Sequence, residues 1–350
     1  MRAPVLHGTR KLTFDEVPDL SAGEGEVIVE VGLCGICGSD LHLYISEMAP
    51  DGIVLGHEFG GSIVDIGPGV EGWKEGDRVV GAMLPACGTC IFCRRGQPDL
   101  CYQHYRLEAQ RIGAARDTGA SLGAGGYAPY ARIAAPRLMR VPDSLDERQA
   151  AAVEPAAVGY HAVRNSGMSI GDTVVVLGAG PIGLFTIQCA RRAGASRIVA
   201  VELVKARADA ALAVGAGEVL DPRAIENLAA EVNRRFPGGP DVVFDAAGVP
   251  ATLQQAVDLV KPGGYVMMVG ASFDPAPVRP SAWVTRRVTV RAAFAYSRGD
   301  YAATIDLLAN GGIDVGPVMS DVVPASATAE AFERLLQPNS EIKILVDPRA

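Results

Sequence analysis

The sequence predicts an α/β protein of two domains, one of them β-rich and the other built on a doubly wound parallel sheet. Three observations lead to this prediction. The chain has 350 residues, which is long for a single hydrophobic core. Residues 1 to about 150 contain short β-branched runs separated by glycine and proline. From residue 173 onward, strand-like and helix-like segments alternate, and a glycine-rich motif joins the first strand to the first helix.

Composition and charge limit the classes of function. Hydrophobic residues make up 49% of the chain and charged residues 21%, as in globular proteins. A net charge of −8 argues against a partner that is nucleic acid or an anionic membrane. The uncharged run at residues 173–190 contains Gly178 and Pro181, which would break a spanning helix. Seven cysteines, an odd number, without an apolar leader at the N-terminus indicate reduced thiols and a cytoplasmic protein.

Residues 37–42 bring a thiol, a hydroxyl, a carboxylate and an imidazole into six positions. They follow the expected strand at residues 27–31, and His57 and Glu58 precede the next one at residues 61–66. Sulfur, nitrogen and carboxylate oxygen together suit zinc. Cys34 and Cys37 also form a C-x-x-C, but no helix start of the thioredoxin type follows, so we interpret Cys34 as a small buried residue.

Four further cysteines lie close together in the chain. Two residues separate each of the first three, and seven separate the third from the fourth; they are Cys87, Cys90, Cys93 and Cys101. Four thiolates can enclose one tetrahedral ion without an open position, which is typical of structural zinc. A zinc ribbon that binds nucleic acid is the alternative, and the acidic chain counts against it.

The segment after residue 173 carries a dinucleotide-binding motif. Gly178, Gly180 and Gly183 form G-x-G-x-x-G between the expected strand at residues 173–177 and an apolar helix. The next expected strand, at residues 197–201, ends in Glu202, whose carboxylate can accept from a ribose hydroxyl and repels a 2′-phosphate. The motif therefore favours NAD over NADP.

The rest of the second half continues the alternation. We expect strands at residues 218–220, 241–244 and 264–269, helices at 149–166, 224–236 and 251–260, and a tail of two helices, 300–310 and 325–336, and a strand, 342–346. Glu154 lies in the first of these helices amid apolar residues. Local sequence alone favours a solvated carboxylate at the start of a helix, whereas the apolar surroundings favour a cationic partner.

These motifs, in this order, resemble the zinc-dependent medium-chain dehydrogenase/reductase family along essentially the whole chain. The similarity is closest to its sorbitol/polyol and 2,3-butanediol dehydrogenase branch. It rests on GICGSD at residues 35–40, GHE at residues 56–58, the cysteine spacing, and Glu154-Pro155, which matches the Glu-Pro of the polyol branch. One departure is Gly38, which stands where the alcohol dehydrogenases have a pyrophosphate-binding arginine, so Lys343 is expected to take more of that role.

The resemblance implies a domain layout and a set of sites. A GroES-like catalytic domain would span residues 1–148 and 292–350, with a zinc lobe at about 85–105, and a Rossmann NAD-binding domain would span residues 149–291. The implied ligands of a catalytic zinc are Cys37, His57, Glu58 and Glu154, and those of a structural zinc are Cys87, Cys90, Cys93 and Cys101. The expected cofactor contacts are Gly178, Gly180, Pro181, Ile182, Gly183, Glu202, Arg207, Val269, Phe294 and Lys343.

The implied reaction is hydride transfer between NAD and a secondary alcohol, vicinal diol or polyol, or the matching ketone. Ser39 and His42 would carry the alcohol proton to solvent, and Asp40 would orient His57. One alternative is an amino-alcohol dehydrogenase of the threonine type on the same machinery; a remote one is an NAD-sensing zinc-ribbon regulatory protein. The family pattern further implies a homo-oligomer, dimer or tetramer, with a small-molecule substrate and neither nucleic acid nor membrane as a partner.

Overall fold

The computed structural model describes residues 1–49, 51–82, 87–95, 97, 100–101, 125–272, 274–337 and 340–350. Of the zinc lobe expected at about 85–105, residues 85–86, 96, 98–99 and 102–105 lie outside this part. The chain forms two compact units. The first comprises Met1–Glu154, Ser297–Asn310 and Met319–Ala350, and the second Pro155–Tyr296 and Gly311–Val318.

This division differs from the expected one at residues 149–154, which belong to the first unit, and at residues 292–296 and 311–318, which belong to the second. The difference at residues 311–318 is the larger one. Hydrogen bonds to Gln188, a residue of the second unit, explain why residues 311–318 belong to it. The backbone amide of Asp314 donates to Gln188 Oε1 at 2.7 Å, and Gln188 Nε2 donates to the Asp314 carbonyl at 3.0 Å. Two hydrogen bonds to one buried side-chain amide thus hold this loop on the second unit.

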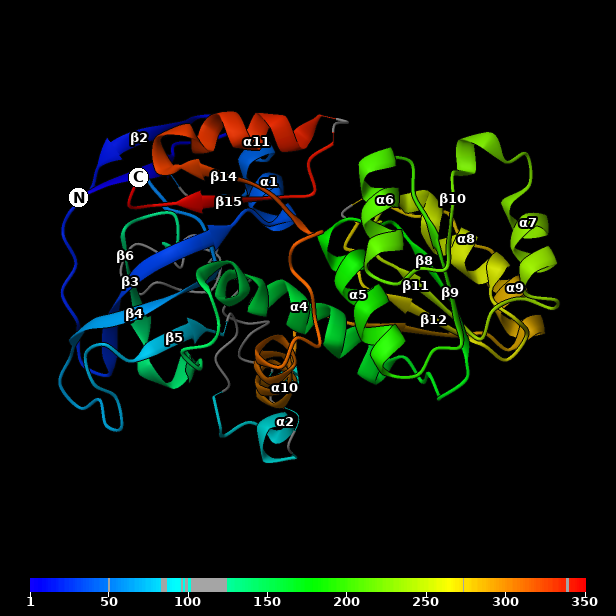
Figure 1. Ribbon diagram of the computed structural model, residues 1–350, viewed down its shortest axis with the longest axis horizontal. Coiled ribbons are helices and arrows are strands. Elements are labelled where there is room, and N and C mark those ends of the chain that lie inside the picture. Colours follow the sequence, from blue (N-terminus) through cyan, green and yellow to red (C-terminus); the bar gives the residue numbers. More distant parts are fainter. Residues whose placement is uncertain are drawn as a thin grey trace. The chain divides into compact units, whose positions relative to one another are not determined.

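The first unit is built on a seven-stranded sheet in the order β14-β15-β3-β4-β5-β7, with β6 also paired to β3 (Figure 1). Its strands are β3 (Glu26–Gly35), β4 (Glu58–Ile66), β5 (Arg78–Gly81), β6 (Tyr130–Ala134), β7 (Leu138–Arg140), β14 (Met319–Pro324) and β15 (Lys343–Asp347). β1 (Arg2–Leu6) and β2 (Leu12–Glu16) form a separate antiparallel pair. β3 is apolar and almost wholly buried because it is paired along both edges.

Among the described residues, the helices of the first unit are α1 (Gly38–Ile45), α2 (Ile91–Arg94), α10 (Arg298–Ala309) and α11 (Thr328–Leu336). The N-terminal part of α4 (Glu147–Asn165) also belongs to this unit, up to Glu154. Phe332 of α11 lies in the same hydrophobic core as the residues of β3 and α1. That core supports α1, the helix that follows Cys37.

The second unit is a six-stranded parallel sheet in the order β10-β9-β8-β11-β12-β13 (Figure 1). Its strands are β8 (Thr173–Leu177), β9 (Arg197–Val201), β10 (Glu218–Leu220), β11 (Val242–Asp245), β12 (Tyr265–Met268) and β13 (Thr289–Ala292), and its helices are α5 (Pro181–Arg192), α6 (Lys205–Ala213), α7 (Leu228–Arg235), α8 (Pro250–Leu259) and α9 (Pro280–Arg286). The strand order reverses between β8 and β11, which is the arrangement of dinucleotide-binding sheets. The predicted fold class is therefore confirmed.

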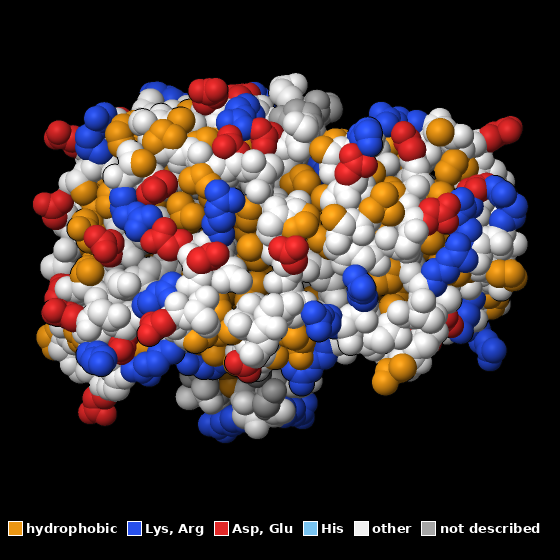
Figure 2. Space-filling view, viewed as in Figure 1, with side chains coloured by type: hydrophobic (Ala, Val, Ile, Leu, Met, Phe, Trp, Pro, Cys, Tyr) orange, Lys and Arg blue, Asp and Glu red, His pale blue; other side chains and the backbone are white. Residues whose placement is uncertain are grey.

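Two observations bear on possible partners. On the face drawn in Figure 2, acidic and basic side chains lie interspersed. Within the described residues, no helix is long and apolar enough to cross a membrane.

Candidate active site

The register of the first sheet brings three chain segments to one point. Gly35, at the end of β3, pairs with Glu58 of β4 on one side and with Leu345 of β15 on the other. Cys37 therefore follows β3 at the place where His57 enters β4 and Lys343 begins β15. Gly35 has no side chain because a Cβ atom there would collide with the Glu58 carboxylate.

Cys37, His57 and Glu58 converge closely enough to share an ion. The Cys37 sulfur, one His57 ring nitrogen and one Glu58 oxygen all lie within 4.8 Å of one another. His57 and Glu58 are buried, and Cys37 is half-buried, so Cys37 is the most accessible of the three. Thiolate, imidazole and carboxylate are the donor types that zinc accepts together.

Asp40 lies beside one nitrogen of the imidazole. Its Oδ1 atom lies 3.5 Å from His57 Nδ1, and both side chains are almost fully buried. Burial disfavours the protonated imidazole, but the charges of Asp40 and Cys37 outweigh this and raise the pKa of His57. Burial likewise disfavours the Asp40 carboxylate, yet the pKa of Asp40 is lowered by His57 and by its hydrogen bonds. With Nδ1 directed at Asp40, Nε2 is left to bind a metal.

Glu58 also forms a buried ion pair. Lys343 Nζ lies 2.6 Å and 2.8 Å from the two Glu58 oxygens and donates to the Ile36 carbonyl at 2.8 Å. Burial lowers the pKa of Lys343, but the negative charges of Glu58, Cys37 and Glu154 together raise it above its usual value. The ammonium expected on the cofactor pyrophosphate is thus engaged with Glu58, and its pyrophosphate role stays a prediction.

Three further predicted residues lie near this group. Glu154 of α4 is buried, but among the described residues the group with ligand atoms within 4.8 Å of one another does not include it. Its role as a ligand stays a prediction. Ser39 and His42 are half-buried on α1 and three positions apart, so they share one face of that helix.

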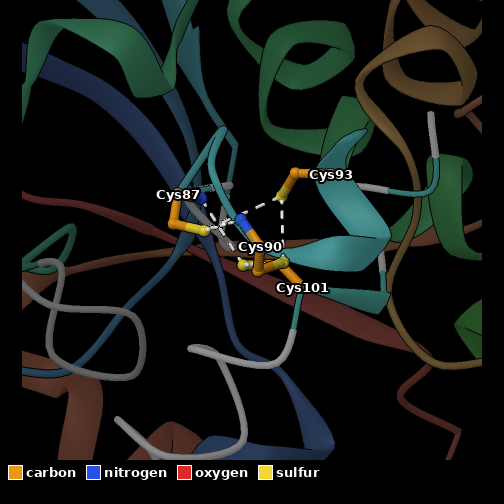
Figure 3. Close-up of side chains that lie close together, drawn as sticks. All are labelled: Cys87, Cys90, Cys93 and Cys101. Carbon is orange, nitrogen blue, oxygen red and sulfur yellow. Dashed lines mark hydrogen bonds between the residues drawn. The ribbon is translucent and has the colours of Figure 1, made fainter. Parts of the chain in front are cut away.

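The four cysteines of the lobe also converge (Figure 3). The sulfur of Cys90 lies 3.5 Å from that of Cys93 and 3.9 Å from that of Cys101, and the sulfurs of Cys87 and Cys93 are 3.9 Å apart. A tetrahedral ion with metal–sulfur bonds of ~2.3 Å requires sulfurs about 3.8 Å apart. The geometry therefore fits zinc held by four thiolates.

In the second unit, most predicted cofactor residues lie at one edge of the sheet. Gly178, Glu202, Val269 and Phe294 each come at or just after the carboxyl end of a parallel strand, where dinucleotides bind. Gly178 has a φ of +86°, and a Cβ there would collide with the backbone of Ala247. Ile182 and Gly183 lie in the first turn of α5, which begins at Pro181, and Arg207 is half-buried on α6.

The Glu202 carboxylate is tied to the glycine loop. Its Oε2 accepts from the Ala179 amide at 2.7 Å, and its Oε1 accepts from the amides of Leu203 at 2.7 Å and Val204 at 2.8 Å. Each oxygen has two lone pairs, so acceptor capacity remains for a ribose hydroxyl. Glu202 therefore both shapes the loop and carries negative charge beside it.

Two residues near the site have other roles than ligation. Cys34 is fully buried, and burial raises the pKa of its thiol, which agrees with the interpretation as a small core residue. The sequence suggested Tyr127 only as one of several aromatic residues that could line a substrate pocket, and it did not indicate that the Tyr127 hydroxyl donates to Asp40 Oδ2 at 2.7 Å. No pattern in the Gly- and Ala-rich sequence before it marks this tyrosine, and only the fold brings it to Asp40.

Comparison with known proteins identifies the family. Residues 23–143 match the alcohol dehydrogenase GroES-like domain, and residues 181–310 match the zinc-binding dehydrogenase domain. The chain is 34% identical to the (R,R)-butanediol dehydrogenase of Bacillus subtilis (strain 168), over 99% of this chain and 100% of that protein. It is 32% identical to the sorbitol dehydrogenase of the same organism, over 99% and 97%.

Comparison with solved structures indicates the same family. A zinc-binding dehydrogenase from Sinorhizobium meliloti 1021 bound to NADP superposes with a TM-score of 0.87 at 30% identity, covering 99% of both chains. A short chain alcohol dehydrogenase from E. coli CFT073 complexed with NADH superposes with a TM-score of 0.85 at 27% identity, also covering 99% of both. The chain therefore belongs to the zinc-dependent medium-chain dehydrogenase/reductase family, in its sorbitol and butanediol dehydrogenase branch, and is an oxidoreductase that acts on a small molecule.

Proposed function

We propose that this enzyme oxidises a secondary alcohol group of a small diol or polyol with NAD, and reduces the matching ketone in reverse. The observation that carries the proposal is the convergence of Cys37, His57 and Glu58, with Asp40 behind the imidazole. The similarity to proteins named butanediol and sorbitol dehydrogenase supports the substrate class.

We propose two zinc ions per chain. Cys37 and His57 would hold the catalytic ion, with Glu58 or Glu154 as the carboxylate partner, and the four cysteines of the lobe would hold the structural one. A catalytic zinc supplies Lewis acidity, which lowers the pKa of an alcohol toward neutrality. Lys343 neutralises Glu58 in the present arrangement, so we take Cys37 and His57 as the primary ligands.

The proton of the alcohol needs a path out of the site. Ser39 is three residues before His42 on α1, so a proton passed to the serine hydroxyl can continue along the same helix face to the imidazole. Histidine exchanges protons with solvent near neutral pH because of its ordinary pKa. We assign Ser39 as the first acceptor and His42 as the residue that delivers the proton to water.

The cofactor would bind over the glycine loop of the second unit. The amides at the start of α5 are suited to the pyrophosphate, because a helix N-terminus carries partial positive charge. Glu202 favours NAD, since its carboxylate accepts from a ribose hydroxyl and repels a 2′-phosphate. We further propose a homo-oligomer, from the family pattern, and a reducing compartment such as the cytoplasm, since no disulfide joins any of the seven cysteines, all of which lie in the described part of the chain.

A substrate panel tests the proposal. Purified enzyme is assayed with NAD and with NADP on diols, polyols, simple secondary alcohols and 2-amino alcohols, and zinc is counted per chain. We expect NAD-linked oxidation of a diol or polyol, about two zinc ions per chain, and loss of turnover in Cys37→Ser with the circular dichroism spectrum unchanged.

Three results would contradict the proposal. Zinc-loaded enzyme that oxidises only 2-amino alcohols would replace the substrate class with that of a threonine-type dehydrogenase. Gently purified protein that contains no zinc would overturn the mechanism itself. Salt-dependent binding to nucleic acid without any alcohol oxidation would point instead to the regulatory alternative.

A further inference from the structure

We propose that Tyr127 is a positioning residue for the catalytic zinc site, acting through Asp40 on the orientation of His57. The inference rests on the proposed function, because it requires zinc at Cys37 and His57. Tyr127 precedes β6 and lies outside the group of candidate ligands. Its effect on the metal would therefore be exerted through hydrogen bonds.

Tyr127 connects the two segments that carry the ligands. Its hydroxyl donates to Asp40 Oδ2 at 2.7 Å, and Asp40 lies on α1, three residues after Cys37. Its backbone amide donates to the Leu55 carbonyl at 3.1 Å, two residues before His57. One side chain and one amide of the same residue thus fix both segments relative to each other.

The hydroxyl determines which oxygen of Asp40 is available to the imidazole. Oδ2 accepts from the Tyr127 hydroxyl at 2.7 Å and from the Cys37 amide at 3.1 Å. Oδ1 is left facing His57 Nδ1 at 3.5 Å. Because Oδ2 has two donors, the carboxylate cannot rotate about its χ2 angle without breaking both hydrogen bonds. The imidazole is therefore presented with an acceptor in a fixed place.

Packing around Tyr127 leaves little freedom for the ring. Tyr127 is fully buried, and its ring meets Phe332 edge-on, with 6.0 Å between centroids. Gly56, with a φ of +98°, lies so close that a Cβ atom there would come within 2.9 Å of the Tyr127 ring and amide. Burial, followed by the charge of Asp40, raises the pKa of Tyr127, so the hydroxyl remains a donor.

The chain offers a matched control in Tyr44. Its ring meets the same Phe332 edge-on, at 5.2 Å, it is almost fully buried, and its hydroxyl donates to a carboxylate, that of Glu333, at 2.8 Å. That carboxylate pairs with Arg10 rather than with an imidazole. Tyr44→Phe therefore removes a comparable hydroxyl from the same core without touching Asp40.

The test measures zinc affinity in the intact enzyme by titration with a competing chelator. Each of the two zinc ions should give its own release step in the titration. The step that is missing in Cys37→Ser belongs to the catalytic ion. Loss of a partner that orients a ligating histidine lowers metal affinity by 10–100-fold, and Tyr127 lies one hydrogen bond further away, so we expect Tyr127→Phe to lower affinity at this site by about tenfold. Tyr44→Phe should leave this affinity unchanged, and neither variant should affect release from the cysteine lobe.

A double-mutant cycle separates positioning from packing. If Tyr127 acts through Asp40, Tyr127→Phe should have almost no further effect on zinc affinity in an Asp40→Asn background. Additive effects in the cycle, equal losses in the two Tyr→Phe variants, or an unchanged affinity in Tyr127→Phe would each overturn the inference while leaving the proposed function intact. If zinc release from the wild-type enzyme shows no step that disappears in Cys37→Ser, both this inference and the proposed function are wrong.

Discussion

Replacing Lys343 with methionine tests the buried ion pair at the site. The methionine keeps most of the chain length but removes the ammonium that lies 2.6 Å and 2.8 Å from the Glu58 oxygens and 2.8 Å from the Ile36 carbonyl. Glu58 is 1% exposed, so water cannot replace the lost donor. Removal of one partner from such a buried pair costs about 3–5 kcal/mol, because a charge stays buried without compensation.

The assay is urea unfolding of enzyme from which the catalytic zinc has been removed, with the free energy of unfolding taken by linear extrapolation. We expect Lys343→Met to lose about 3–5 kcal/mol in this state and less in zinc-loaded enzyme, since bound zinc would compensate Glu58. The double variant Lys343→Met/Glu58→Gln should regain much of the loss, because the uncompensated charge of Glu58 is then removed.

The control is Arg349→Met, which removes an ion pair with Asp347 and breaks the partly exposed pair of Arg349 with Glu147. Their side chains are 38% and 45% exposed, so its loss should cost at most about 1 kcal/mol. If Lys343→Met destabilises the enzyme no more than Arg349→Met, the view of Lys343 as the charge that compensates Glu58 is wrong.

Three further predictions follow from other contacts. His7 lies between Asp15 and Asp51, whose hydrogen bonds raise its pKa. The two pairs therefore stabilise the folded protein fully below pH ~6.5, the ordinary pKa of histidine, and this stabilisation is lost as the pH rises through the raised pKa of His7. His7→Gln should therefore lower the free energy of unfolding by about 0.2–1 kcal/mol at pH 6 but not at pH 9, as unfolding curves at both pH values will reveal. Cys90→Ser should reduce the zinc content by one ion per chain in metal analysis, with the Cys37 site still loaded. Glu202→Gln should raise the ratio of kcat/KM for NADP to that for NAD by about tenfold or more, since a charge-assisted hydrogen bond and a repulsive charge are both removed; an unchanged ratio would exclude Glu202 as the discriminating residue.

The parts of the molecule that the sequence predicted are those governed by local pattern. Every strand of the second unit from β8 to β12 was expected within one or two residues, because each is a short apolar run between turns. The strand β13 and the helix α9 were missed, since their exposed and half-exposed residues give no apolar period. The four cysteines were found because their sulfurs converge within fifteen residues of sequence.

Contacts between distant residues could not be predicted in this way. Glu58 and Lys343 are 285 positions apart, and Asp40 and Tyr127 are 87 apart. Their pairing depends on the register of β3 with β4 and β15, which no single segment encodes. The sequence predicted that Glu58 lies near a metal and that Lys343 is functional, but it did not indicate that the two neutralise each other.

Because Cys34 is buried, its reaction with a thiol reagent reports whether the enzyme is folded. Cys34 and Cys189 are both buried, and burial raises the pKa of Cys189 to about 12, so neither presents a thiolate to an alkylating reagent while the protein is folded. Cys37 is half-buried and three residues from Cys34. Alkylation confined to Cys37 would therefore report an empty metal site in a folded molecule, whereas alkylation that reaches Cys34 would report unfolding. A single peptide, read by mass spectrometry, would distinguish loss of metal from loss of structure.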